Sequence, residues 1–255
     1  MNIYISPTNQ PNTYPVGNTT EQKECAKIAK VVGDTLSNYQ VNYKIGDEKQ
    51  LMWITDKGKL TGGRIKEAID WGADYYIELH TNAGSSTATG ATCFIRFINE
   101  MPKLANALIA GLNGICPYKS NRSTSVHEGF SSGWGAVKYP ELGGVRGMLL
   151  EINFHSNIKV AKWIIENTKS IGEMIGNTLA FELGLKEKEN KKEKENENNL
   201  PELWRINKGV EIKTKPPLTI SKSGIYTITE KRGNWGKLKS GIGWVDLTQA
   251  KNIGR

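Results

Sequence analysis

A histidine and a glutamate lie in or directly after two largely apolar segments of this sequence. His80 follows the run 75–79, and Glu151 lies within the run 147–154. Short apolar runs of this kind are typical of buried strands. In open α/β sheets ligands bind in the crevice beyond the carboxyl ends of the strands, and neutral imidazole is the commonest metal ligand among side chains. The two residues therefore favour metal-assisted hydrolysis as a first hypothesis.

A second carboxylate, Glu21, lies near the predicted start of a helix. Residues 2–5 predict a short strand, and the segment 6–18 reads as a polar loop punctuated by Pro and Gly. Apolar residues after Glu21 recur at helical spacing, at Cys25, Ile28, Ala29, Val32 and Leu36. Candidate site groups thus follow several strands: Gln10 or Asn12, Glu21, His80 and Glu151.

The elements that position these groups alternate along the first two thirds of the chain. Patterns typical of helices occupy residues 63–71, 101–112 and 159–183, and patterns typical of strands occupy 75–79, 91–97 and 148–152. This alternation predicts an α/β fold, a twisted and mostly parallel sheet with helices on both faces.

Four short motifs resemble zinc-dependent N-acetylmuramoyl-L-alanine amidases of the amidase-3 type, which occur in bacterial cell-wall hydrolases and phage endolysins. The motifs are Ile5-Ser6-Pro7, Gly-Asn-Thr-Thr-Glu at 17–21, Glu-Leu-His-Thr-Asn-Ala at 78–83, and Leu-Glu-Ile-Asn-Phe-His-Ser-Asn at 150–157. The match covers about residues 1 to 183. It implies that Glu21 and His80 bind zinc and that Glu151 is the catalytic carboxylate. Asn82, in the third motif, is a candidate for substrate contact.

The chemistry of amide hydrolysis explains why such residues are needed. Zinc lowers the pKa of its bound water to about 7 and polarises the carbonyl group. A carboxylate must then move the proton, and Glu151 is the candidate general base and later acid, a role worth about 10²–10⁴-fold.

The identity of the third zinc ligand is the main departure from the family. The family's first loop usually supplies a second histidine, whereas here it offers the amides of Asn9, Gln10 and Asn12. Carboxylate, imidazole and thiolate are the usual zinc ligands. The other candidates are His127, in a Gly/Ser-rich segment, and His155, which an extended strand would place on the same face as Glu151. Gln10 is the ligand we predict, with Asn12, His127 and His155 as alternatives.

The last quarter of the chain differs in character from the rest. Residues 186–199 contain no apolar residue and therefore cannot form a buried core. They predict a solvated linker, which we assign to residues 186–200. It separates a catalytic domain at 1–185 from residues 201–255, whose short β-rich pieces resemble bacterial SH3-like cell-wall-binding domains. Trp235, Trp244 and Tyr226 are candidates both for wall contact and for the core of this small barrel.

Charge points to the partners of this C-terminal domain. Residues 201–255 hold 11 Lys and Arg against 4 Asp and Glu, so they carry nearly all of the chain's net charge of +8. Basic surfaces attract polyanions, and no nucleic-acid-binding motif accompanies the charge. We expect peptidoglycan and anionic wall polymers as partners, and no nucleic acid.

The N-terminus, the hydropathy of the chain and its cysteines indicate where the protein is made and where it acts. The sequence contains no apolar run of about 18 residues and no basic-then-apolar N-terminus. We expect a protein that is made in the host cytoplasm without a signal peptide, does not insert into membranes, and acts on the wall after release, as a phage lysin does. Three cysteines, an odd number in apolar contexts, argue against a disulfide framework. The function that we expect is hydrolysis of the amide bond between N-acetylmuramic acid and L-alanine. The alternative functions are those of a catalytically impaired wall-binding protein and of a zinc peptidase that cuts within the stem peptide.

Overall fold

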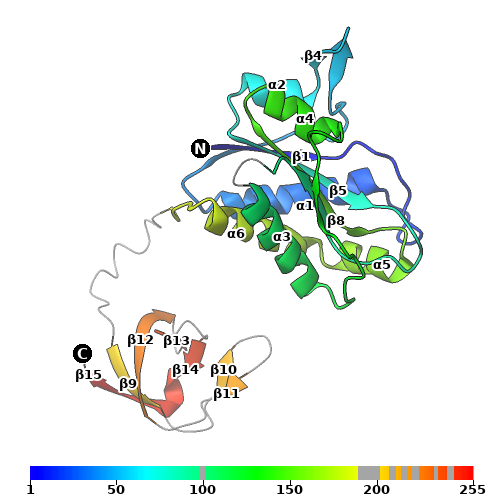
Figure 1. The fold of residues 1–255 in the computed structure, drawn as a ribbon. Helices are drawn as coiled ribbons and strands as arrows, with labels where there is room; N and C mark the ends of the chain where they lie inside the picture. The colour runs from blue at the N-terminus through cyan, green and yellow to red at the C-terminus, as the bar shows by residue number, and fades with distance from the viewer. Residues whose placement is uncertain are drawn as a thin grey trace. The chain divides into compact units, whose positions relative to one another are not determined.

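In the computed structural model the chain forms two compact units, Met1–Lys188 and Glu189–Arg255 (Figure 1). The structure describes residues 1–97, 101–188, 202–206, 211–213, 218–219, 224–232, 235–239 and 244–254. Within these residues no helix is long and apolar enough to span a bilayer. Cys25, Cys93 and Cys116 are buried and free, as expected for small hydrophobic residues.

The first unit is built on a sheet that, within residues 1–97 and 101–188, has six strands in the order β2-β1-β5-β8-β6-β7. Strands β1 (Asn2–Pro7), β2 (Asn42–Ile45), β5 (Tyr75–Asn82) and β8 (Arg146–Phe154) run parallel. Strand β6 (Thr92–Ile95) is antiparallel to β8, and β7 (Val126–Glu128) is parallel to β6. The predicted mostly parallel sheet is confirmed, with its last two strands reversed.

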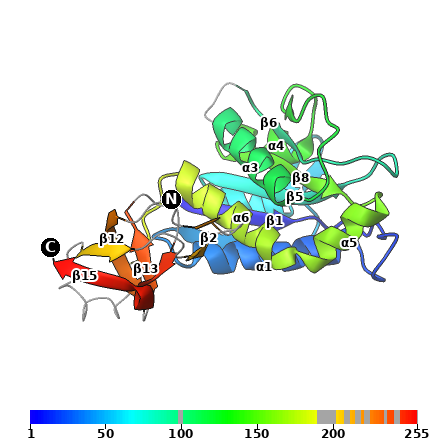
Figure 2. The same cartoon turned by 90° about the horizontal axis from the view of Figure 1, so that it is seen from below.

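Four helices cover one face of this sheet. They are α1 (Glu21–Leu36), α3 (Met101–Ile115), α5 (Ile158–Glu166) and α6 (Thr168–Glu182), and Figures 1 and 2 show α1, α3 and α6 side by side on it. Their apolar stripes and the strands share one core that includes Ile5, Ile28, Leu79 and Leu150. The predicted helix 159–183 is divided in two, because Asn167 leaves helical geometry at φ −118° and ψ 19°.

Two short helices cover the opposite face. Helices α2 (Arg64–Asp70) and α4 (Gly135–Leu142) pack on Tyr4, Tyr76 and Leu149. Side chains of a strand alternate between faces, so Glu78, His80 and Glu151 project from this same face, nearer the carboxyl ends. Helices α2 and α4 leave the part of this face near the carboxyl ends of the strands uncovered, and a pocket lies there. A hairpin of β3 (Ile54–Asp56) and β4 (Lys59–Gly62) leads into α2.

The second unit is a small antiparallel sheet. Its described residues form seven strands in the order β11-β10-β14-β13-β12-β9-β15. Their bounds are Glu202–Ile206 (β9), Glu211–Lys213 (β10), Leu218–Thr219 (β11), Gly224–Arg232 (β12), Trp235–Leu238 (β13), Trp244–Asp246 (β14) and Ala250–Gly254 (β15). Ile228, Leu238, Val245 and Leu247 make its core. The SH3-like assignment stays a prediction.

The start of the predicted linker belongs to the first unit. Gln40 N donates to Lys186 O at 2.7 Å, and Lys188 N donates to Asn38 O at 2.7 Å. Residues 186–188 therefore run alongside the turn after α1, whereas the remainder of the predicted linker, 189–200, lies outside the described residues.

Candidate active site

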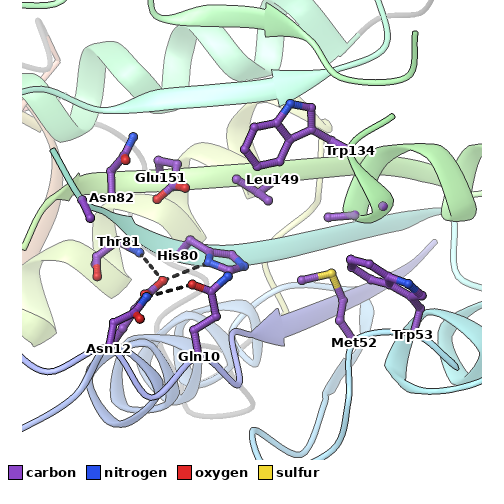
Figure 3. Close-up of a pocket in the computed structure, with 14 residues that line it drawn as sticks. Gln10, Asn12, Met52, Trp53, His80, Thr81, Asn82, Trp134, Leu149 and Glu151 are labelled. Carbon is purple, nitrogen blue, oxygen red and sulfur yellow. Dashed lines mark hydrogen bonds and ion pairs between the residues drawn. The ribbon is translucent and has the colours of Figure 1, made fainter. Parts of the chain in front are cut away.

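A pocket of about 290 Å³ lies at the carboxyl edge of the parallel strands (Figure 3). It brings together the segments after β1, the start of α1, and the ends of β5 and β8. Its lining residues are Gln10, Asn12, Glu21, Met52, Trp53, His80, Thr81, Asn82, Ala83, Trp134, Gly135, Ala136, Leu149 and Glu151. The sequence candidates Gln10, Glu21, His80, Asn82 and Glu151 thus meet in one pocket.

Glu21 and His80 form the buried centre of this site. Thr20 caps α1 by accepting a hydrogen bond from Lys23 N, which fixes Glu21 as the first helical residue. His80 Nδ1 lies 2.9 Å from Glu21 Oε1, and Thr81 N donates to the same oxygen at 3.1 Å. Glu21 is 1% exposed and His80 is 3% exposed. The helix start and the strand end therefore hold the two side chains against each other.

Two amide side chains complete one wall of the pocket. Asn12 Nδ2 donates to Glu21 Oε2 at 2.7 Å and to Gln10 Oε1 at 2.8 Å. The backbone supports this arrangement, because Glu21 N donates to Asn12 O and Gln22 N donates to Gln10 O. The loop after β1 thereby delivers both amides to the start of α1.

A buried ion pair supports His80 from beneath. Glu78 Oε1 lies 3.6 Å from His80 Nε2 and accepts a hydrogen bond from Arg64 Nη2 at 3.0 Å. Arg64, fully buried, also donates to Ser6 Oγ at 2.7 Å. Burial raises the pKa of Glu78, but its contacts with His80 and Arg64 outweigh burial and lower it. Burial lowers the pKa of His80, but the hydrogen bond to Glu21 and the nearby carboxylate of Glu78 outweigh that effect and raise it to about 10.

Glu151 lies on the strand next to His80. The two residues are register partners in the β5–β8 ladder. Glu151 is 8% exposed, and among the described residues its Oε2 has no hydrogen-bond partner. Burial, and to a lesser degree the charge of Glu21, raises the pKa of Glu151 to about 7, against the opposing effect of His80. A carboxyl group that titrates near neutrality can both accept and return a proton.

His155 does not reach the pocket. The β5–β8 register shifts between the pairs His80–Glu151 and Asn82–Phe154, so β8 holds one extra residue there. Such a bulge reverses the alternation of faces. His155 consequently stacks on Tyr14 at 5.0 Å, and its Nδ1 lies 2.9 Å from Thr81 Oγ1. The even spacing from Glu151 was therefore misleading.

His127 lies beside the pocket and not in it. It stacks on Phe94 at 5.1 Å and lines an adjacent hollow together with Asn82. Within the described residues, no group of three His, Cys, Asp or Glu side chains is placed to hold a metal ion. Neither of the alternative histidines joins His80 and Glu21.

Two tryptophans that the sequence patterns did not single out form the other end of the pocket. Trp53 precedes β3, and Trp134 precedes α4 (Figure 3). The sequence places each aromatic residue beside Gly or Met in a loop, without periodicity that would signal a site. Their convergence depends on the packing of α4 and the β3–β4 hairpin at one pocket.

The predicted wall-contact aromatics occupy two faces of the second unit. Tyr226 packs against the hydrophobic core of that unit. Trp235 and Trp244 flank the buried positions Gly236 and Val245, so strand alternation places both on the face opposite the core. Both tryptophan side chains are half-buried.

Solved amidase structures share this architecture. AmiC2 of Nostoc punctiforme, an N-acetylmuramoyl-L-alanine amidase, matches with a TM-score of 0.56 at 14% identity, over 72% of this chain and 97% of that chain. The CwlD amidase from Clostridioides difficile, solved in complex with the GerS lipoprotein, matches with a TM-score of 0.56 at 17% identity, over 72% and 98%. An N-acetylmuramoyl-L-alanine amidase from Clostridium difficile 630 gives 0.55 at 18% identity, over 72% and 96%.

This chain has the fold of N-acetylmuramoyl-L-alanine amidases. No protein-family model and no curated protein matches its sequence. Within this amidase fold, the pocket lies where Glu21, His80 and Glu151 converge, at the edge at which open α/β sheets bind ligands.

The donor atoms of the pocket fit zinc at two positions. Imidazole and carboxylate are ordinary zinc ligands, and His80 Nδ1 and a carboxylate oxygen of Glu21 lie together in the pocket. His80 Nε2 is a buried atom with no hydrogen-bond partner among the described residues. The third donor available in the same pocket is the neutral amide of Gln10 or Asn12. This donor set fits zinc with two strong ligands and one weak ligand.

Proposed function

We propose that this chain is a peptidoglycan hydrolase that cleaves the amide bond between N-acetylmuramic acid and the L-alanine of the stem peptide. The observation that carries the proposal is the convergence of Glu21, His80 and Glu151 in one pocket of an amidase fold. The resemblance of four sequence motifs to amidases of the same activity supports it independently.

The proposal includes a zinc ion held by His80 and Glu21, with Gln10 as the third protein ligand. Zinc would supply Lewis-acid polarisation of the scissile carbonyl and a water of lowered pKa. Glu21 would be oriented for this by Thr81 N and Asn12 Nδ2, which donate to its two oxygens. Such supporting hydrogen bonds fix the geometry of ligating side chains.

Glu151 carries out the proton transfers in this proposal. Its carboxylate accepts a proton from the attacking water and returns it to the nitrogen of the leaving L-alanine. A pKa of about 7 suits both steps at neutral pH. Its place beside His80 on the neighbouring strand supports this role.

The second unit would hold the enzyme on the wall. Trp235 and Trp244 share the face that does not pack on its core, and residues 201–255 are strongly basic. Binding of anionic wall polymers by such a surface raises the local concentration of substrate for the first unit. A wall-lytic, endolysin-like role is therefore part of the proposal.

Digestion of purified peptidoglycan, with and without a chelator, tests this function. We expect release of new alanine amino termini, no new reducing sugar ends, and loss of release on chelation. Release of alanine termini that a chelator does not reduce would support the amidase activity and contradict the role of zinc.

Two other results would overturn the assignment. Release of other amino termini would identify a peptidase that cuts within the stem peptide. No release by a protein that still pellets with the wall would identify a wall-binding protein, a role that the missing third strong ligand also favours.

A further inference from the structure

An aromatic wall closes one end of the active-site pocket. It consists of Trp53 and Trp134, which line the pocket although they remain 39% and 41% exposed. Figure 3 shows them at the end opposite Asn82, with His80 and Glu151 between. Ligand pockets are lined predominantly by hydrophobic and aromatic side chains, so exposed tryptophans in a pocket are candidates for ligand contact.

Packing holds both rings in place. Trp134 stacks on Phe94 with ring centroids 4.2 Å apart, and Trp53 lies 5.8 Å from Tyr139. The ring of Trp53 also lies over Gly135, where an added Cβ would come within 2.8 Å of Cη2. Glycine therefore fits at position 135 without strain, whereas a larger residue would fit there only if the Trp53 ring moved. A fixed ring loses little entropy when a ligand stacks on it.

The chemistry of these rings favours a sugar. The face of an aromatic ring is electronegative, and the faces of a pyranose present C–H groups that carry a small positive charge. A hexosamine therefore stacks on tryptophan while its hydroxyl and acetamido groups remain in water. Of the two parts of a muropeptide, the glycan suits the aromatic wall better than the charged peptide does.

A polar hollow borders the pocket at Asn82 and extends to Phe94, the ring on which Trp134 stacks. It has a volume of about 440 Å³ and is lined by Asn82, Thr92, Phe94, Asn121, Arg122, Ser123, Thr124, His127 and Phe154. Asn82 lines both the hollow and the active-site pocket, so the two are adjacent. Among the described residues that line the hollow there is no Asp or Glu.

Arg122 gives this hollow a preference for anions. Its guanidinium lies over the Phe154 ring, 4.8 Å from the centroid, and donates to Asn121 Oδ1 at 2.8 Å. These contacts orient the planar group while its other donors stay available to solvent. Guanidinium groups bind carboxylates in a bidentate manner. A stem peptide carries such carboxylates, whereas the uncharged glycan backbone does not.

We infer that the pocket fixes the direction of its substrate, with the glycan across Trp53 and Trp134 and the acidic stem peptide in the hollow beside Arg122. The inference rests on the proposed amidase function, since it assigns the two halves of that substrate to two ends of one pocket. The scissile amide then lies between them, at His80 and Glu151.

Hydrogen-exchange mass spectrometry of the full chain tests this direction without requiring catalysis. The probes are peptide-free glycan strands and a glycan-free stem peptide with free carboxylates. We expect the glycan to slow exchange around residues 53 and 134, and the peptide to slow exchange around residue 122. Trp134→Ala should weaken the glycan effect, and Arg122→Gln the peptide effect, by about tenfold or more in ligand concentration, as truncation of an anchoring aromatic or arginine typically does.

Matched controls separate this from a general loss of structure. Phe181→Ala removes an aromatic that is 81% exposed on α6, and Arg146→Gln removes an arginine at the amino end of β8. Neither should change either protection pattern. Reversed patterns, or protection by both probes at one end, would overturn the inference while leaving the amidase intact. Protection confined to residues outside 1–188 would also overturn it. Failure of the amidase itself would appear separately, as absence of alanine termini in the peptidoglycan digest.

Discussion

Glu151 of β8 and His80 of β5 are register partners on adjacent parallel strands. Neighbouring strands lie about 4.8 Å apart, and both side chains project from the face left open beyond α2 and α4. The strand pairing thus sets the separation of the proposed base and metal ligand, and rigid strands hold it more precisely than loops would.

Replacing Glu151 by Gln tests the role of the carboxylate. Glu151→Gln keeps the shape of the side chain but removes the proton acceptor, so we expect hydrolysis to fall by about 10²–10⁴-fold. Binding to the wall should be unchanged. Glu166→Gln, at the exposed end of α5, is the matched control. Turnover of alanine termini by the Glu151 variant at the wild-type rate would remove Glu151 from the mechanism.

The same substitution should raise stability in a pH-dependent way. The pKa of Glu151 is raised from 4.5 to about 7 in the folded protein, so the folded state binds a proton more tightly than the unfolded chain does. Wild-type stability therefore falls as pH rises from 4.5 through 7, a loss that Glu151→Gln avoids. We expect the variant's advantage in chelator-treated protein to be largest above pH 7 and to disappear towards pH 4.5. Thermal unfolding at a series of pH values measures it, and an advantage that grows in acid would contradict the assigned shift.

Metal binding should depend on His80 and improve with a stronger third ligand. His80→Ala should lose zinc, whereas Gln10→His should bind it more tightly because imidazole replaces a neutral amide. Competition with a chromogenic chelator measures both affinities. Gln40→His, before β2 at the opposite edge of the sheet, serves as the control. Equal zinc affinity of the wild type and Gln10→His would mean that Gln10 is not the third ligand.

Replacing only Arg64 in the buried Arg64–Glu78 pair should destabilise the protein far more than replacing both residues. Arg64→Met leaves the Glu78 carboxylate buried without its cation, which typically costs about 3–5 kcal/mol. Arg64→Met with Glu78→Leu removes both charges and should recover much of that loss. Denaturant unfolding of the single and double variants gives the coupling energy. If the double variant is as unstable as the sum of the single variants, the pair is not coupled.

The boundary of the first unit can be placed by truncation. A chain ending at residue 188 keeps the hydrogen bonds of Lys186 and Lys188 to the turn at 38–40, whereas a chain ending at 185 loses them. Hydrogen bonds contribute about 0.5–1.5 kcal/mol each, so the shorter chain should unfold at a lower temperature. Both should lose most wall pelleting, and full pelleting by either would place wall binding in the first unit.

Much of the fold and part of the site follow from the sequence, because their signals are local. Helical spacing after Glu21 and the apolar run before His80 each describe a segment that buries one side. Parallel strands then bring their carboxyl ends to one edge, whatever the details of packing. Gln10, Glu21, His80, Asn82 and Glu151 were therefore predictable as neighbours.

Tertiary structure decided what local patterns do not encode. Register between β5 and β8 pairs His80 with Glu151, and the bulge after Glu151 turns His155 away. Both depend on hydrogen bonding between strands far apart in the chain. Trp53 and Trp134 meet because the β3–β4 hairpin and α4 pack at the same pocket. Local sequence patterns determine which segments bury their side chains. The positions of these segments relative to one another depend on strand-pairing and packing energies summed over the whole domain.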